Sequence, residues 1–273
     1  MSESSWESLK EKGNALFKEK RYKDAITFYQ KALKINPNIE VLYSNKGTCE
    51  KCLKDYKQAV RDYQKALDIN PKNTKNLNRL ASVYIIQGDI GQAKMVQEKA
   101  LNLEPYNSTY KEQMTVIEKI LEDQIKLEDK INEKKFDDAE EVCKRLIEKI
   151  SDNSLLKIKY IKILIENVKL TECLSYINKE VNDNDKQSDE SFDYLIALCL
   201  YYDGQYDKAK KQLNIMISKG NKIDTADLLN KVNTIESVKK KPMIFLNKKN
   251  MKKLLKNIPR FSNLILIIKN LIL

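Results

Sequence analysis

The sequence of 273 residues contains no histidine. Without histidine, the chain has no Ser/His/Asp or Cys/His arrangement for nucleophilic catalysis, and it lacks the commonest general base. No glycine-rich phosphate-binding loop is present in the sequence either. These absences predict that the protein is not an enzyme and that it carries no cofactor.

Glycine and proline are scarce, with six and five residues respectively. Because few helix breakers interrupt the chain, the sequence predicts an all-α protein. The first ten residues, MSESSWESLK, include no apolar run, so we expect no signal peptide.

Cysteine occurs five times, without the spacing of a disulfide framework, at Cys49, Cys52, Cys143, Cys173 and Cys199. This usage favours a reducing compartment, and we expect a cytoplasmic protein. Cys49 and Cys52 form a Cys-x-x-Cys motif, but the second ligand pair that a zinc site needs is missing. We therefore predict no metal site and interpret the two cysteines as small helical residues.

Acidic residues are absent from the C-terminal end of the chain. The stretch from Lys239 to Leu273 carries ten Lys and Arg and no Asp or Glu, whereas residues 1–238 carry 40 basic and 39 acidic residues. The net charge of +11 therefore belongs to one tail, and the body is nearly neutral. We expect no uniformly basic face and no nucleic-acid partner.

Three interpretations of the tail, residues 241–273, stay open. The first interpretation is a truncated or frame-shifted gene, because AT-rich codons encode the Lys, Asn, Ile and Leu residues of the tail. A basic amphipathic segment with weak contact to a membrane surface is the second interpretation. A membrane span is the third, although the apolar stretch 264–273 is shorter than the ~20 residues that a span needs.

A period of 34 residues runs through the first part of the chain without an insertion. The recurring sets are Ala25, Ala59 and Ala93; Ala32, Ala66 and Ala100; Pro37, Pro71 and Pro105; Tyr29 and Tyr63; and Gly13, Gly47 and Ala81. Small residues let two antiparallel helices approach closely, the tyrosines fill the gap between neighbours, and each proline separates two units. Since one such unit cannot bury its apolar face alone, stacked units share a continuous core.

These residues resemble the tetratricopeptide-repeat family, through Lys12-Gly13-Asn14, Ala25, Tyr29, Ala32, Pro37 and their copies. The resemblance implies an α-solenoid superhelix of about six helix-turn-helix repeats. We place three repeats at 6–39, 40–73 and 74–107, with a capping helix over 110–134, in a first domain at 6–119. Looser copies at 136–139 and 204–209 predict repeats at 120–153, 154–187 and 190–223 and a closing helix over 224–238, in a second domain at 120–240.

Five polar residues stand on the first helices of the first three repeats. Lys10 and Asn14 are one turn apart on one helix, Asn45 lies on the next, and Lys75 and Arg79 are one turn apart on the third. These three cations and two amides include no carboxylate. Such a set suits an extended peptide with a free C-terminal carboxylate and a neighbouring acidic side chain.

The five residues and their flanks resemble the two-carboxylate clamp of co-chaperones that bind the Glu-Glu-Val-Asp tails of Hsp70 and Hsp90. The similar segments are Leu9-Lys10-Glu11-Lys12-Gly13-Asn14, Val41-Leu42-Tyr43-Ser44-Asn45 and Lys75-x-x-x-Arg79. By this resemblance, Lys10, Asn14 and Asn45 would hold the terminal Asp and its carboxylate. Lys75 and Arg79 would hold acidic residues upstream.

The second set of repeats lacks these residue types at the aligned positions, which hold Gln124, Glu128, Lys159, Ser191 and Leu195. That half either supports the first or binds something else, such as client protein. Two tandem sets joined by a long helix resemble the DnaJ-type tetratricopeptide co-chaperones, whose J domain carries a His-Pro-Asp motif that this sequence lacks. The first 110 residues also resemble the Hsp70–Hsp90 organising family. Two other function classes stay open: a general assembly scaffold with a different partner, and a membrane-associated import or adaptor protein.

Overall fold

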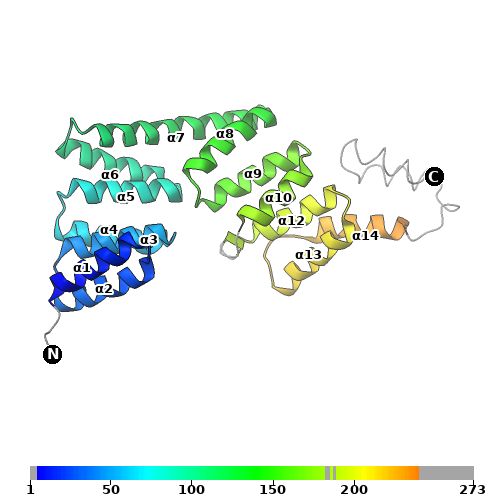
Figure 1. Cartoon of the computed structure of the whole chain (residues 1–273). Helices are drawn as coiled ribbons and strands as arrows, with labels where there is room; N and C mark the ends of the chain where they lie inside the picture. Colours follow the sequence, from blue (N-terminus) through cyan, green and yellow to red (C-terminus); the bar gives the residue numbers. More distant parts are fainter. Residues whose placement is uncertain (1–4, 182–184, 187–188, 240–273) are drawn as a thin grey trace. The chain divides into compact units, whose positions relative to one another are not determined.

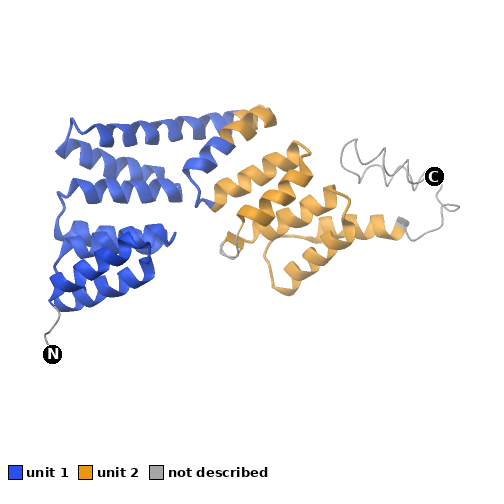
Figure 2. Ribbon diagram, in the orientation of Figure 1, with its two compact units in different colours: residues 1–129, 144–153 blue, residues 130–143, 154–273 orange. Residues whose placement is uncertain are grey.

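The computed structural model describes residues 5–181, 185–186 and 189–239, and every regular element within those ranges is an α-helix (Figure 1). The predicted all-α fold class is therefore confirmed. The chain divides into two compact units, residues 1–129 with 144–153 and residues 130–143 with 154–273 (Figure 2). The basic tail at 241–273 lies outside the described residues.

Three helix pairs form most of the first unit. They are α1 (Trp6–Lys18) with α2 (Tyr22–Ile35), α3 (Glu40–Cys52) with α4 (Tyr56–Ile69), and α5 (Thr74–Gln87) with α6 (Ile90–Leu103). The first helices begin 34 residues apart, and so do the second helices. Residues 34 positions apart therefore occupy the same position in successive helix pairs. This spacing places side chains that are far apart in sequence on one face of the stacked pairs.

A residue with left-handed backbone makes the turn within each helix pair. The turn residues are Lys20 (φ 61°), Lys54 (φ 61°) and Gly88 (φ 80°) in the first unit, and Lys134 (φ 57°), Val168 (φ 58°) and Gly204 (φ 80°) in the second. Only glycine adopts this conformation without steric cost. The recurrence of one turn geometry six times in the described residues agrees with the solenoid of about six pairs expected from the sequence.

Close packing within the first two pairs depends on a glycine that faces a tyrosine. A Cβ atom at Gly13 would lie 2.6 Å from Cε1 of Tyr29, and one at Gly47 would lie 3.2 Å from Cε1 of Tyr63. Both tyrosines are buried. The glycines therefore leave the space that the aromatic rings fill.

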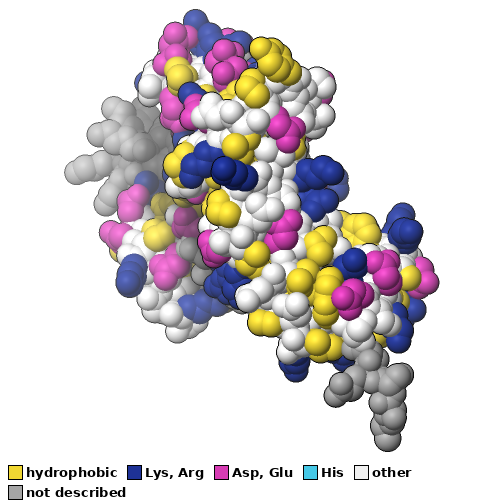
Figure 3. Space-filling view, turned by 90° about the vertical axis from the view of Figure 1, so that its left-hand side faces the viewer, with side chains coloured by type: hydrophobic (Ala, Val, Ile, Leu, Met, Phe, Trp, Pro, Cys, Tyr) yellow, Lys and Arg dark blue, Asp and Glu magenta, His cyan; other side chains and the backbone are white. Residues whose placement is uncertain are grey.

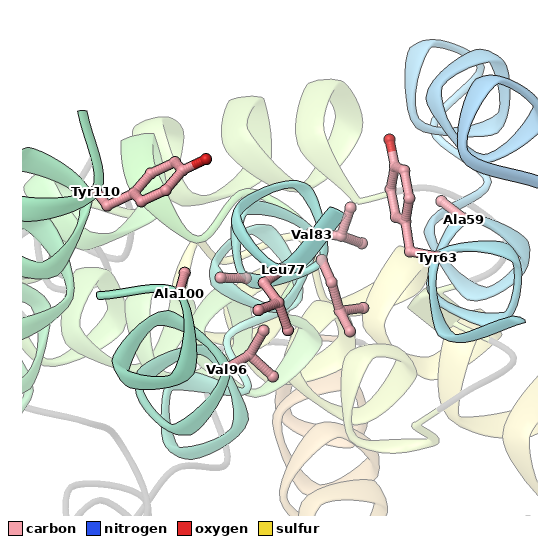
Figure 4. Close-up of a cluster of buried hydrophobic side chains, with 9 residues drawn as sticks. Ala59, Tyr63, Leu77, Val83, Val96, Ala100 and Tyr110 are labelled. Atoms are coloured by element: carbon pink, nitrogen blue, oxygen red, sulfur yellow. The ribbon is translucent and has the colours of Figure 1, made fainter. Parts of the chain in front are cut away.

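The third pair has Gln97 where the first two have tyrosine. Gln97 is fully buried, and its Nε2 donates to the backbone oxygen of Tyr110 at 2.9 Å. Tyr110 lies near the start of α7 (Ser108–Asn132), and its ring joins the core cluster around Tyr63 and Ala100 (Figure 4). In this way α7, in the stretch for which a capping helix was predicted, supplies the aromatic side chain that the repeat itself lacks.

The chain returns to the end of α5 after α8 (Phe136–Lys149). The backbone nitrogen of Asp152 donates to Ile86 O at 3.0 Å, and Asn153 Nδ2 donates to Gln87 O at 3.0 Å. These bonds satisfy carbonyl groups at the C-terminal end of the helix, which have no partner within it. Gly88 leaves room for the contact, because a Cβ there would lie 2.3 Å from Asn153 Nδ2.

The second unit continues with further helices, which are α9 (Ser154–Glu166), α10 (Leu170–Glu180), α12 (Ser191–Tyr202), α13 (Tyr206–Ser218) and α14 (Ala226–Lys239). Its core includes Leu213 and Met216 of α13 and Val232 of α14, so α14 closes this core in the stretch predicted for a closing helix. No helix within the described ranges is long and apolar enough to cross a membrane.

Candidate functional site

The five residues predicted to bind a peptide carboxylate, called the clamp residues below, lie on α1, α3 and α5. Lys10 and Asn14 are on α1, Asn45 is on α3, and Lys75 and Arg79 are on α5. Lys75 is exposed and the other four are half-buried. All five can therefore meet a ligand from solution, while four have side chains restrained by their surroundings.

Asn14 and Asn45 are directly bonded to each other. Asn45 Nδ2 donates to Asn14 Oδ1 at 3.1 Å, and the hydroxyl of Tyr29 donates to the same oxygen at 2.9 Å. With its oxygen used twice, Asn14 is oriented so that its Nδ2 is the group left to bind an acceptor. Burial raises the pKa of Tyr29 well above its usual range, so this hydroxyl keeps its proton and remains a donor.

Arg79 is held by neutral groups. Its Nη1 donates to Ser44 Oγ at 2.6 Å, and Ser44 Oγ donates in turn to Asn76 Oδ1 at 2.5 Å. Ser44 and Asn76 are buried, so this chain fixes α3 against α5 directly beside Asn45. Among the described residues, no carboxylate lies within ion-pair distance of Arg79. Its guanidinium therefore retains donors that suit an acidic ligand.

The other two cations have acidic neighbours that the sequence reasoning missed. Lys10 Nζ lies 3.2 Å from Glu11 Oε1, and Asn14 Nδ2 donates to Glu11 Oε2 at 3.3 Å. Hydrogen bonds from Asn14 and then Lys10 lower the pKa of Glu11. Lys75 contributes, after the Thr74 hydroxyl and other groups, to lowering the pKa of Glu104. Glu11 is adjacent to Lys10 in sequence, but nothing in the local sequence links Glu104 to Lys75.

Lys46 follows Asn45 in α3 but belongs to a separate buried network. Its Nζ donates to Glu50 Oε1 at 2.6 Å and to Asp62 of α4. Glu50 is 5% exposed and Asp62 is 3% exposed. Burial, followed by the contact with Asp62, raises the pKa of Glu50 to about 8. This network joins α3 to α4, and Lys46 is already paired with acidic residues inside it.

The positions in the second set of repeats that align with the clamp residues differ from them in residue type and burial. Leu195, aligned with Arg79, is 3% exposed and belongs to the core. Lys159, aligned with Asn45, is exposed. The described structure therefore offers no second copy of the Asn14–Asn45–Arg79 arrangement at these places.

Charge of both signs is spread over the face of the molecule that Figure 3 shows. In the space-filling view, Lys and Arg side chains are interspersed with Asp and Glu side chains (Figure 3). This distribution agrees with the near balance of charge in residues 1–238. Within the described ranges, no group of three or more Cys, Asp or Glu stands close enough together to hold a metal ion.

Tetratricopeptide-repeat family models match residues 6–39, 41–73, 62–95 and 192–219. The chain is 47% identical over 47 residues to sperm-associated antigen 1 of Rattus norvegicus, a segment that covers 17% of this chain and 5% of that protein. It is 46% identical over 43 residues to Hsp70-Hsp90 organizing protein 3 of Arabidopsis thaliana, covering 16% of this chain and 8% of that protein. The matched segments are thus a small part of these curated relatives.

Solved structures that resemble the chain include two tetratricopeptide domains. The crystal structure of the P58(IPK) tetratricopeptide domain matches with a TM-score of 0.70 and 15% identity, over 94% of this chain and 74% of that one, and so shows the same fold. The first tetratricopeptide domain of Spaghetti (RPAP3), bound to the HSP90 peptide SRMEEVD, is 31% identical over 44% of this chain and 95% of that one, with a TM-score of 0.42. The 34-residue period, the helix pairs and the matching repeat models show that the chain contains tetratricopeptide repeats.

Proposed function

We propose that the first three helix pairs bind extended peptides that end in Glu-Glu-Val-Asp, the C-terminal tails of Hsp70 or Hsp90. In this proposal the protein is a cytoplasmic co-chaperone that acts by binding and not by catalysis. The identity to Hsp70-Hsp90 organizing protein 3 over 43 residues supports the assignment to this class of partner.

The observation that carries the proposal is the hydrogen-bond chain from Tyr29 through Asn14 to Asn45. It turns Asn14 Nδ2 toward an acceptor, and in the unbound chain that acceptor is the carboxylate of Glu11. Glu11 also contacts Lys10, so it holds the place of a ligand carboxylate at both residues. Because Glu11 is exposed, its side chain can rotate into solvent when a peptide carboxylate replaces it.

Arg79 and Lys75 would bind the acidic side chains of the peptide. Arg79 is anchored through one nitrogen to Ser44, which leaves the rest of its donors for a carboxylate. A charge-assisted hydrogen bond of this kind contributes about 1.5–3 kcal/mol when shielded from water. With several such bonds offset by the ordering of the peptide, we expect micromolar affinity, roughly −7 to −8 kcal/mol.

The proposal is tested by titrating a fluorescently labelled peptide ending in Glu-Glu-Val-Asp with the full-length chain. We expect Asn14→Ala and Arg79→Ala each to weaken binding about 10-fold or more. Lys12→Ala and Lys72→Ala serve as matched controls, because both lysines are exposed and neither belongs to the clamp residues. Equal affinity of all four variants and the wild type would rule out this site.

If the folded wild-type chain binds no Glu-Glu-Val-Asp peptide, the site binds a different partner. In that case, proteins retained from a lysate by the wild type and lost with Arg79→Ala would identify a scaffold with a different ligand. Retention of Hsp70 or Hsp90, lost with the same variant, is the result expected of the co-chaperone.

A further inference from the structure

Lys51 is a second half-buried lysine of α3, and its surroundings differ from those of Lys46. Its Nζ donates to Ser82 Oγ of α5 at 2.7 Å, and Ser82 Oγ donates to the backbone oxygen of Arg79 at 2.6 Å. No described carboxylate lies within ion-pair distance of Lys51. Lys46, five residues earlier in the same helix, has two.

The charge of Lys51 is therefore uncompensated in the unbound protein. Burial lowers the pKa of its ammonium group, and the nearby Arg79 lowers it further. On the same helix, the pKa of Lys46 is raised instead, despite burial, because its hydrogen bonds to Asp62 and Glu50 favour the charged form. A half-buried cation without an acidic partner is costly, and an incoming anion would remove that cost.

We propose that Lys51 and Arg79, linked through Ser82, form a further anion subsite of the peptide-binding site, which binds an acidic side chain upstream of the Glu-Glu-Val-Asp end. This inference rests on the proposed peptide-binding function and extends it to the sequence preference of the same site. The Ser82 hydroxyl accepts from Lys51 and donates its one hydrogen to the backbone oxygen of Arg79. It therefore positions Lys51, and the anion is bound by the two cations.

Lys51 is six residues after Asn45, which places it about 9 Å further along the axis of α3. The clamp residues assign the peptide a course across α1, α3 and α5, so this rise does not fix a position along the peptide. The upstream position of the preferred acid is therefore found by scanning the peptide sequence.

The test compares peptides that end in Glu-Glu-Val-Asp and carry Ala, Glu or phosphoserine at successive upstream positions. The full-length wild type should bind the best Glu peptide about 3- to 10-fold more tightly than the Ala peptide. Phosphoserine at that position distinguishes a carboxylate-selective subsite from one that accepts either anion. Lys51→Met keeps the apolar stem and removes the charge, and it should abolish the preference, so that the Glu and Ala peptides bind the variant with equal affinity.

Lys57→Met is the matched control, since Lys57 is exposed on the next helix and should leave the preference intact. Thermal unfolding of Lys51→Met separates a ligand role from a structural one. Removal of an uncompensated charge should leave the variant as stable as the wild type, or more stable. The subsite alone would be overturned if the Ala peptide binds and an upstream acid adds no affinity. It would also be overturned if Lys51→Met retains the added affinity. Failure of every peptide to bind would overturn the proposed function together with it.

Discussion

Asn45 Nδ2 donates to Asn14 Oδ1 at 3.1 Å, which joins the first and second helix pairs at the centre of the clamp residues. The hydroxyl of Tyr29 bonds to the same oxygen from α2. A core tyrosine of the repeat therefore also sets the orientation of a ligand-binding amide. The side chains that stack the repeats and those proposed to bind the peptide share hydrogen bonds.

Tyr29→Phe should weaken binding of the Glu-Glu-Val-Asp peptide about 3- to 10-fold, while the free energy of unfolding falls by about 1 kcal/mol at most. The substitution removes the hydroxyl that orients Asn14 and keeps the buried ring. Tyr63→Phe is the matched control, because the Tyr63 hydroxyl bonds to Thr48 at 3.0 Å and to none of the clamp residues. Isothermal titration calorimetry measures both affinities. Equal weakening by the two variants would contradict a specific role for Tyr29.

Gly13→Ala should destabilise the first unit by about 1–3 kcal/mol, since the new Cβ would lie 2.6 Å from the ring of Tyr29. Gly91→Ala should have the opposite effect. Gly91 lies within α6, and a Cβ atom added there would meet no other atom within 4 Å, so alanine gains helix propensity of about 0.5–1 kcal/mol. Urea unfolding followed by circular dichroism would measure both. Destabilisation by both substitutions would show that helix propensity does not decide the outcome at Gly91.

The stability of the first unit should fall as pH rises from about 5 to 9. The pKa of Glu50 is raised to about 8 in the folded chain and is 4.5 when unperturbed, so the folded state binds the proton more tightly across this range. Glu50→Gln cannot ionise and leaves the contact between Lys46 and Asp62 in place. It should therefore reduce the pH dependence by about 1–2 kcal/mol.

Chemical denaturation at several pH values, from 5 to 9, measures this dependence. Glu98→Gln is the control, because Glu98 is an exposed residue of α6 and should leave the slope unchanged. A slope in Glu50→Gln that equals the wild-type slope would mean that Glu50 does not carry the effect.

Val168→Gly should stabilise the second unit by about 0.5–1 kcal/mol. Val168 has a φ of 58°, a conformation that strains a β-branched residue, and its side chain is 58% exposed, so little packing is lost. Val116→Gly makes the same change within helix α7 and should destabilise by about 1 kcal/mol. Thermal melts of both variants check the sign. A loss of stability at Val168 would contradict the strain argument.

Much of the first unit could be predicted from the sequence because its determinants recur every 34 residues. Gly13 with Tyr29 and Gly47 with Tyr63 mark the close approach within each pair, and that pattern is visible without a structure. The replacement of tyrosine by Gln97 carried no such signal. Its partner is a backbone oxygen of Tyr110 in the next helix, so only the folded chain shows why a buried glutamine is tolerated.

Long-range contacts also limited what could be predicted about the site. The residue types of the clamp could be identified on equivalent helices, but the bond between Ser44 and Arg79 joins residues 35 positions apart. Likewise, Lys46 and Lys51 look alike in sequence, and only the placement of Asp62 and Ser82 distinguishes a paired lysine from an uncompensated one. The contact of Asn153 with Gln87 spans 66 positions and follows no local pattern.

The central claim is that the first unit recognises a free C-terminal carboxylate, and the most direct test compares one peptide in two forms. A Glu-Glu-Val-Asp peptide with a free C-terminus and its C-terminally amidated form should be titrated against the full-length chain by calorimetry. Amidation removes one charge and one carboxylate oxygen opposite Lys10 and Asn14, so the amidated peptide should bind about 10- to 100-fold more weakly. Equal affinity for the two forms would contradict the proposed clamp.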